Sequence, residues 1–332
     1  MRRVRSLLLS IGIAAALAGL TLAPVSASYP GQHNGRIAFG IRGTDGSNIF
    51  SVRPDGTGQK QLTKGPGFHF CPSYSPDGRT IAYCANTSGF WEIWTMRANG
   101  SKQHQLTHLE GFATFPDFSP DGKTIAFGGT EGTDEHNEIY AVDAKTGGGL
   151  HALTSCVGLA DGCFNDLPVW SPDGTRIAYM HGVYDPILDA VVDEQVWVMD
   201  ADGGNPHPIT TDSAPKDQVP DWSPDSSKIA YHAGDFGNGG IWVIDADGGN
   251  NHQISGCVAG DPSPCAQGDD WGPAWSPDGK KIAFLRDFGA LGINDRPVYV
   301  MDADGSHQHR VTAAPALHAV PAWQPLGVRH NH

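Results

Sequence analysis

Short runs in which apolar and polar residues alternate recur along most of this 332-residue chain. The clearest stretch starts at residues 219–223, turns at Pro224-Asp225-Ser226 and continues through residues 228–231. After a glycine-rich loop, residues 241–244 alternate again, and residues 252–255 follow an Asp-Gly turn. Alternation with a period of two, bounded by Pro and Asp-Gly signals, predicts strands joined by hairpins. No sustained 3.6-residue pattern follows residue 27, so we predict an all-β protein.

This four-strand pattern is a repeat that is marked by the string WSPDG or a close variant. The serines of the string stand 44 to 53 residues apart, at Ser75, Ser119, Ser171, Ser223 and Ser276. Every copy is followed by an Ile-Ala-aromatic strand, of which residues 81–83 are the first example. A period of this size is typical of a four-stranded propeller blade.

The two ends of the chain carry incomplete copies of the repeat. Residues 36–39, 48–52 and 61–63 supply only the last three strands of a unit, whereas residues 320–325 supply only a first strand. Together they make one whole unit, which with the five complete units gives six. We therefore predict a six-bladed β-propeller with four antiparallel strands per blade, closed by strand 320–325, because closure removes the exposed sheet edges.

The first residues have the features of a signal peptide. Arg2, Arg3 and Arg5 precede an apolar run at residues 7–23, and residues 25–27 supply the small-residue pattern for cleavage. A membrane anchor is the alternative, but this run of 17 residues is short for a span of about 20. We expect residues 1–27 to be removed and residues 28–332 to form one secreted, periplasmic or cell-envelope domain.

The charge of the chain argues against some classes of partner. The formal net charge is −14, and it becomes −17 when the three arginines of the leader are removed. Nucleic acids and anionic membranes bind proteins through Lys and Arg, so we expect no nucleic-acid partner and no stable membrane insertion. The acidity serves either ligand attraction or solubility, and the expected state is a monomer.

Six cysteines in an exported chain predict three disulfides. Folding residue 74 back onto residue 81 across the turn places Cys71 directly opposite Cys84. The other four cysteines close two short loops at the same point of the repeat. The predicted pairs are Cys71–Cys84, Cys156–Cys163 and Cys257–Cys265.

The WSPDG-x-x-IAF unit with its Asp-Ala-Asp-Gly-Gly turn resembles the repeat of TolB-type β-propellers over essentially all of residues 28–332. TolB itself carries an additional α/β domain before its propeller, and the resemblance here is to the propeller alone. The resemblance implies a ligand site at the mouth of the central channel, where the first strands of the blades begin.

The register of the repeat identifies the residues at that mouth. The predicted ligand-binding residues are His69, Thr114, Asn165, Asp166, Asp217, Gln218, Asp270, Trp271 and His318. Of these, His69, Asp217, Asp270 and His318 would hold a divalent cation, Ca²⁺, Mg²⁺ or Mn²⁺, because carboxylates and imidazoles are its ligands. The alternative is that these positions are polar because a channel is wet.

Five other histidines form no such site. They are His104, His151, His207, His252 and His309, and each lies three residues before the Thr or Ser that ends a fourth strand. One histidine per blade on the outer edge cannot share a metal, so we interpret these five as structural.

The remaining motifs favour a protein without catalysis. No serine has Gly at both −2 and +2, and neither a phosphate-binding glycine loop nor a Cys-His zinc pattern occurs. We therefore expect a secreted module that binds a protein, peptide or glycan at the channel face. A metal-assisted lyase or hydrolase with its site in the ring is the alternative, and a purely structural envelope component is the third reading.

Overall fold

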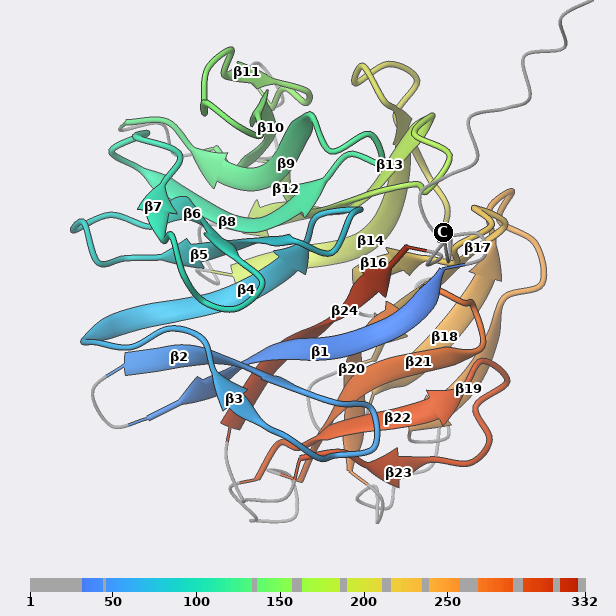
Figure 1. Ribbon diagram of the computed structural model, residues 1–332. Coiled ribbons are helices and arrows are strands. Elements are labelled where there is room, and N and C mark those ends of the chain that lie inside the picture. The colour runs from blue at the N-terminus through green and yellow to red at the C-terminus, as the bar shows by residue number, and fades with distance from the viewer. Residues whose placement is uncertain are drawn as a thin grey trace, which may run out of the picture.

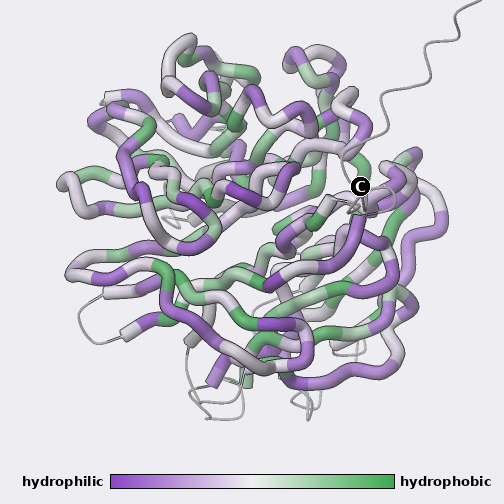
Figure 2. The backbone as a smooth tube through the Cα atoms, in the orientation of Figure 1, coloured by the Kyte–Doolittle hydropathy of each residue, from purple (hydrophilic) through white to green (hydrophobic). Residues whose placement is uncertain are grey.

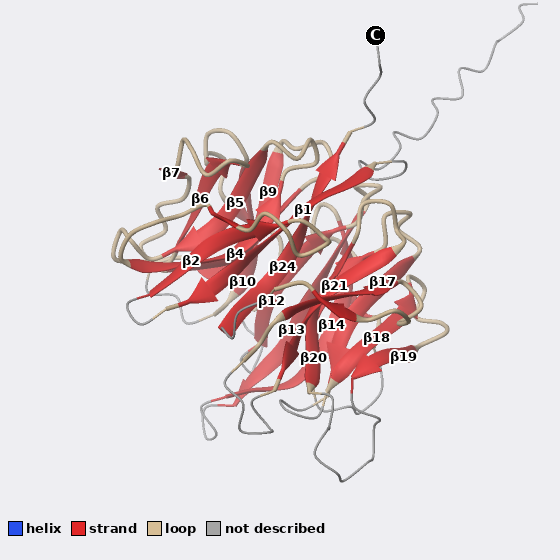
Figure 3. Cartoon of the chain, turned by 60° about the horizontal axis from the view of Figure 1, so that its bottom comes forward, coloured by secondary structure: helices blue, strands red, loops and turns tan. Residues whose placement is uncertain are grey.

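The structure is a computed structural model that describes residues 32–43, 46–132, 136–156, 163–185, 190–210, 216–234, 239–256, 268–288, 295–312 and 317–327. Within these ranges every regular element longer than a turn is a β-strand (Figure 3). Over the same residues there is no helix of the length and apolar character needed to cross a membrane.

The strands form six four-stranded units, here called blades and listed from the innermost strand outward. Blade 1 contains β24 (Leu317–Leu326), β1 (His33–Arg42), β2 (Gly46–Val52) and β3 (Lys60–Gln61). Blade 2 contains β4 (Gly67–Tyr74), β5 (Thr80–Ala85), β6 (Glu92–Arg97) and β7 (His104–Gln105). Blade 3 contains β8 (Phe112–Phe118), β9 (Thr124–Thr130), β10 (Glu138–Asp143) and β11 (His151–Ala152).

The second half of the ring repeats this order. Blade 4 contains β12 (Cys163–Trp170), β13 (Arg176–Asp185), β14 (Ala190–Asp200) and β15 (His207–Pro208). Blade 5 contains β16 (Asp217–Trp222), β17 (Lys228–Ala233), β18 (Gly240–Asp245) and β19 (His252–Gly256). Blade 6 contains β20 (Asp269–Trp275), β21 (Lys281–Asp287), β22 (Val298–Asp302) and β23 (His309–Arg310).

The innermost strands close a ring. β24 contacts β4, β4 contacts β8, and the series continues through β12, β16 and β20 back to β24. The closing strand β24 pairs antiparallel with β1, so the two ends of the described chain lie side by side (Figure 1). A short parallel pairing of β2 with β4 at Gly46 and Gly67 joins blades 1 and 2 into one eight-stranded sheet. The predicted propeller with its composite first blade is confirmed.

The Ile-Ala-aromatic pattern of each second strand fills the spaces between neighbouring blades. Ile81 and Tyr83 of β5 pack in the cluster shared with blade 1, whereas Ala82 belongs to the cluster shared with blade 3. All three side chains are at most 1% exposed, because a blade is covered on both faces. The small alanine leaves room for large side chains of the following blade, such as Phe127. Six such clusters, one at each blade boundary, make up the core.

The WSPDG string forms the turn between the first two strands of a blade. Ser75 Oγ donates to Asp77 Oδ1 at 2.7 Å, and the Thr80 amide donates to Ser75 Oγ at 3.0 Å. The same serine–aspartate bond recurs in blades 3 to 6. Short polar side chains that bond to nearby backbone stabilise turns, which explains why this string repeats.

The five outer histidines lie where the repeat predicts. Each begins a fourth strand, and each is exposed on the rim of a different blade. These outer strands and their loops are largely hydrophilic, whereas hydrophobic stretches lie along the second and third strands of the blades (Figure 2). The prediction that they are outer-edge residues is confirmed.

The structure contains the disulfides Cys71–Cys84 and Cys156–Cys163, with Cα atoms 5.8 and 5.4 Å apart. The predicted Cys257–Cys265 pair lies outside the described residues. The expected register of β4 with β5 is wrong by one residue, because Phe70 and not Cys71 stands opposite Cys84. Cys71 occupies a β-bulge with a φ of 47°, an extra residue that the hairpin count did not include.

Candidate functional site

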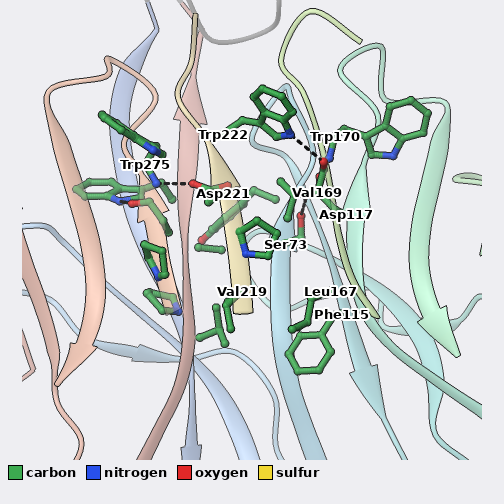
Figure 4. Close-up of a pocket in the computed structure, with 18 of the residues that line it drawn as sticks. Ser73, Phe115, Asp117, Leu167, Val169, Trp170, Val219, Asp221, Trp222 and Trp275 are labelled. Carbon is green, nitrogen blue, oxygen red and sulfur yellow. Dashed lines mark hydrogen bonds between the residues drawn. The ribbon is translucent and has the colours of Figure 1, made fainter. Parts of the chain in front are cut away.

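A cavity of about 160 Å³ lies in the central channel and is lined by residues from all six innermost strands. In five inner strands the lining begins at the residue before the proline, and in β20 it begins at Pro273 itself; from there it extends toward the WSPDG turns. Part of this cavity is drawn in Figure 4, where Phe115, Leu167 and Val219 lie near one another and Asp117 and Asp221 occupy the next level along the channel.

The apolar side chains of the channel come from a repeated bulge. Every inner strand from β4 to β20 has a register shift that spans its proline and the residue before it. The bulge residues Cys71, Phe115, Leu167 and Val219 have φ between 47° and 57°, a region that costs free energy for bulky side chains. Such strain persists where the surrounding structure imposes it, and it often marks a functional region.

Asp117, two residues beyond the bulge of β8, joins three blades. Its Oδ1 accepts a hydrogen bond from Ser73 Oγ of blade 2 at 2.9 Å. Its Oδ2 accepts a hydrogen bond from the Trp170 amide of blade 4, also at 2.9 Å. Burial raises the pKa of Asp117 to about 6, because desolvation outweighs these two hydrogen bonds.

Asp221 has the same position in blade 5. Its Oδ2 accepts a hydrogen bond from the Trp275 amide of blade 6 at 2.5 Å. Burial raises the pKa of Asp221 well above its usual range, and the charge of Asp117 raises it further. The channel therefore holds two interacting carboxyl groups in a mostly apolar lining.

Seven of the nine predicted mouth residues have described side chains, and none of these seven lines the cavity. His69 is buried, and its Nδ1 lies 3.1 Å from the Ser47 carbonyl oxygen. Asp270 is fully buried and pairs with Arg286 through two hydrogen bonds of 2.6 and 2.7 Å. Arg286 also donates to Gln308 at 2.7 Å, so Asp270 belongs to a buried ion-pair network.

Of the two predicted residues of β12, Asn165 belongs to a second buried network. The Asn165 amide donates to Glu138 Oε2 at 3.1 Å, and its Oδ1 lies 2.8 Å from His181 Nδ1. The neighbouring Asp166 accepts a hydrogen bond from the Leu167 amide at 2.8 Å. Burial raises the pKa of Asp166 to about 7, because desolvation outweighs this hydrogen bond, which lowers the pKa.

Three further predicted residues have separate surroundings. Gln218 donates a hydrogen bond to Glu194 of the preceding blade. Trp271 stacks with Arg296, whose guanidinium carbon lies 5.3 Å from the ring centroid. Thr114 is buried, and its hydroxyl has no hydrogen-bond partner among the residues that the structure describes.

The predicted cation ligands are only partly placed. The backbones of Asp217 and His318 pair with Ala233 and Ile41, but the side chains of Asp217 and His318 are outside the described part of the chain. Among the described residues, no three His, Cys, Asp or Glu side chains come together as a metal site. The four-residue cation site stays a prediction.

Asp117 and Asp221 are the site residues that sequence reasoning missed. Both follow the proline of an inner strand, where blades 4 and 6 carry Val169 and Ala274. The other copies carry Ser73, Val169, Ala274 and Ala322 at this position, so a carboxylate there was a signal in the sequence. The predicted ring of ligand-binding residues lies before the proline at the start of each strand, so it does not include these two aspartates.

The fold and the cavity define the class of this protein: it is a closed β-propeller whose largely apolar channel contains two carboxyl groups. Residues 13–191 and 192–329 each match the TolB beta propeller domain family, and the chain belongs to that family. No curated protein matches the chain.

Solved structures show the same fold. TolB from Acinetobacter baumannii is 21% identical with a TM-score of 0.68, and the match covers 87% of this chain and 66% of that one. A chain of the nidogen/laminin complex is 12% identical with a TM-score of 0.65, covering 87% and 98%. Oligogalacturonate lyase in complex with manganese is 17% identical with a TM-score of 0.52, covering 86% and 75%. At these identities the likeness concerns the fold alone.

Proposed function

We propose that this protein is an exported binding module that holds a protein, peptide or glycan partner at its channel. The observation that carries the proposal is the cavity to which all six inner strands contribute. A closed ring of packed blades is a rigid scaffold, and a concave, mostly apolar site with a few polar groups is the usual form of a binding site. The likeness to a propeller in the nidogen/laminin complex supports a protein as the partner.

The proposal includes export, with residues 1–27 as a cleaved signal peptide and residues 28–332 as one domain. The disulfides Cys71–Cys84 and Cys156–Cys163 indicate an oxidising compartment. The intact mass of the protein recovered outside the cytoplasm tests this directly. A chain that begins at Ser28 is expected, and a full-length chain in the membrane fraction would contradict the proposal.

Site-specific photocrosslinking tests the binding function. A photoreactive phenylalanine replaces Phe115 in the channel, and a matched variant carries it at His104 on the exposed rim. In intact cells the channel variant should give a discrete crosslinked partner that the rim variant does not give. Equal crosslinking from both positions, or none from the channel, would reject a channel-binding module.

A metal-assisted lyase or hydrolase is the second candidate, favoured by the likeness to oligogalacturonate lyase in complex with manganese. Elemental analysis of the purified mature protein and of the His69→Ala/His318→Ala double variant separates this candidate from the first. Stoichiometric manganese, calcium or magnesium that disappears in the variant would support it. Absence of stoichiometric metal from both proteins would reject it.

A further inference from the structure

The channel cavity combines an apolar zone with a carboxylate zone at a fixed spacing. Phe115 and Val219 stand two residues before Asp117 and Asp221 on their strands. Two residues of strand span about 6–7 Å, so the two zones are separated along the channel by about that length. An occupant of the whole cavity therefore needs an apolar part and a polar end of similar reach.

The charges of the cavity have one sign. Asp117 and Asp221 interact electrostatically with each other. Within the described ranges, the ion pairs of the protein involve neither of these aspartates. By contrast, the buried Asp270 is paired with Arg286. Two carboxyl groups desolvated without a counter-charge attract a cation from outside the chain.

We propose that the channel binds a primary alkylammonium group, supplied by a lysine side chain of a partner polypeptide. The methylene stem lies against Phe115, Leu167 and Val219, and the ammonium group lies between Asp117 and Asp221. This inference rests on the proposed function and specifies the chemistry that the partner presents. Lysine combines an apolar four-carbon stem, about 6 Å long, with a compact cationic end, which matches the two zones.

Other cations fit this site less well. A divalent metal would find only two carboxylates, since the described residues contain no group of three metal-ligating side chains. Arginine presents a rigid planar fork that suits one bidentate carboxylate. Here the acceptors come from separate blades, with Ser73 Oγ beside Asp117 as a third. Three oxygen-bearing side chains from three blades suit the three rotatable donors of an ammonium group better than one planar fork.

Binding should be linked to ionisation of the two aspartates. Tyr74 is the other titratable residue of the lining, and burial raises its pKa, so it stays neutral over the pH range used. The pKa of Asp117 is raised to about 6 by burial, so its carboxyl group is mostly protonated at pH 5 and ionised at pH 8. An ammonium group binds the ionised form. The affinity should therefore rise about tenfold or more between pH 5 and pH 8, because the ionised fraction of Asp117 rises by that factor.

The test uses the mature protein and three small probes in an NMR titration. Nα-acetyl-lysine methylamide is the main probe, its Nε-acetylated form removes the charge, and Nα-acetyl-arginine methylamide changes the head group. The lysine probe should shift the Trp170 and Trp275 amide signals saturably, with the expected pH dependence. Equal binding of the Nε-acetylated probe, tighter binding of the arginine probe, or pH-independent binding would overturn the proposal.

Variants locate the site. Asp221→Asn and Asp117→Asn should each weaken the lysine probe at least tenfold at pH 8, whereas Asp121→Asn in an exposed turn should not. An equal loss in Asp121→Asn would indicate nonspecific attraction by the acidic protein and would overturn the site. The probe and pH arms need no variant, so a variant that fails to fold leaves the proposal testable.

Two further comparisons are needed. One distinguishes a polypeptide from a free amine as the source of the ammonium group, and the other distinguishes failure of the proposed function from failure of this inference. Cadaverine, a free diamine, should bind no tighter than the lysine probe, and tighter binding would overturn a polypeptide source. A channel that binds the probe but crosslinks to no partner would reject the proposed function. A channel that crosslinks to a partner but ignores the probe would reject this inference alone.

Discussion

Asp117 on β8 accepts a hydrogen bond of 2.9 Å from the backbone amide of Trp170 on β12, across the boundary between blades 3 and 4. Asp221 bonds to the Trp275 amide in the same way between blades 5 and 6. At the intervening boundaries the following blade again supplies the donor, but the donor is a side chain and the acceptor is a backbone carbonyl. There the Trp222 indole donates to the Val169 carbonyl at 3.2 Å, and the Trp323 indole donates to the Ala274 carbonyl at 3.0 Å. Two kinds of contact thus alternate around the second half of the ring.

The Asp117 contact predicts an unusual pH dependence of stability. Because burial raises the pKa of Asp117 from 3.8 to about 6, the folded state binds more protons than the unfolded state between these values. The contribution of Asp117 to the free energy of unfolding therefore falls as pH rises through this window. The free energy of unfolding of the Asp117→Asn variant should therefore rise by ~1–3 kcal/mol relative to that of the parent protein when the pH is raised from 4 to 8. Urea denaturation at both pH values measures this difference.

Asp121→Asn is the control for that prediction, because its shift has the opposite sign. Burial raises the pKa of Asp121, but hydrogen bonds from Lys123 outweigh it and lower the pKa overall. The stabilising contribution of Asp121 is therefore present at pH 8 and is lost as pH falls below its usual pKa. The same trend in both variants would contradict the assignment to Asp117.

Thr107 should contribute more to stability than an exposed threonine. Its hydroxyl accepts a hydrogen bond from the Ile93 amide at 2.8 Å and donates one to Glu92 at 2.5 Å. Thr107→Val keeps the shape of the side chain but removes the hydroxyl partner of the buried Ile93 amide and Glu92 carboxyl group. The free energy of unfolding should fall by about 2–3 kcal/mol. Thr57→Val in an exposed turn should cost under ~0.5 kcal/mol. Chemical denaturation of both variants compares them, and equal losses would contradict this role.

Replacing Gly78 by alanine should destabilise the protein more than the same change at Gly122, the equivalent glycine in the WSPDG turn of the next blade. Both have positive φ, 66° and 69°, so alanine costs about 1 kcal/mol at either position. A Cβ on Gly78 would also lie 2.1 Å from the Pro325 carbonyl oxygen of β24, whereas on Gly122 the nearest atom is 3.7 Å away. The Gly78→Ala variant should therefore lose a further ~1–3 kcal/mol of its free energy of unfolding. Thermal denaturation should rank the two variants, and a similar Tm would argue against close packing of β24 on this turn.

The third disulfide stays a prediction that peptide mapping can check. A non-reduced digest of the purified protein should yield Cys257 linked to Cys265, together with the two pairs that the structure contains. Cys257 linked to a cysteine of another blade would contradict the assignment. Cys257→Ser/Cys265→Ser should reduce stability by ~2 kcal/mol if the bridge restrains the unfolded chain.

The sequence by itself determined the architecture of this protein, because the signals that specify a blade are local. Alternation within a strand, the Ser75–Asp77 turn and the Ile81–Tyr83 pattern each depend on residues a few positions apart. Repetition of these signals predicted the number of blades, the closing strand, the outer histidines and two disulfides that the structure contains.

Only the tertiary structure decided the site. The bulge at Cys71 shifts the register by one residue, and a left-handed residue before proline has no signature when the residue is Cys, Phe, Leu or Val. The pairing of Asp270 with Arg286 and the meeting of Asp117 with Asp221 depend on strands that are brought together by ring closure. Charges and partners of buried groups depend on neighbours distant in the chain, so residue type and spacing alone did not predict them.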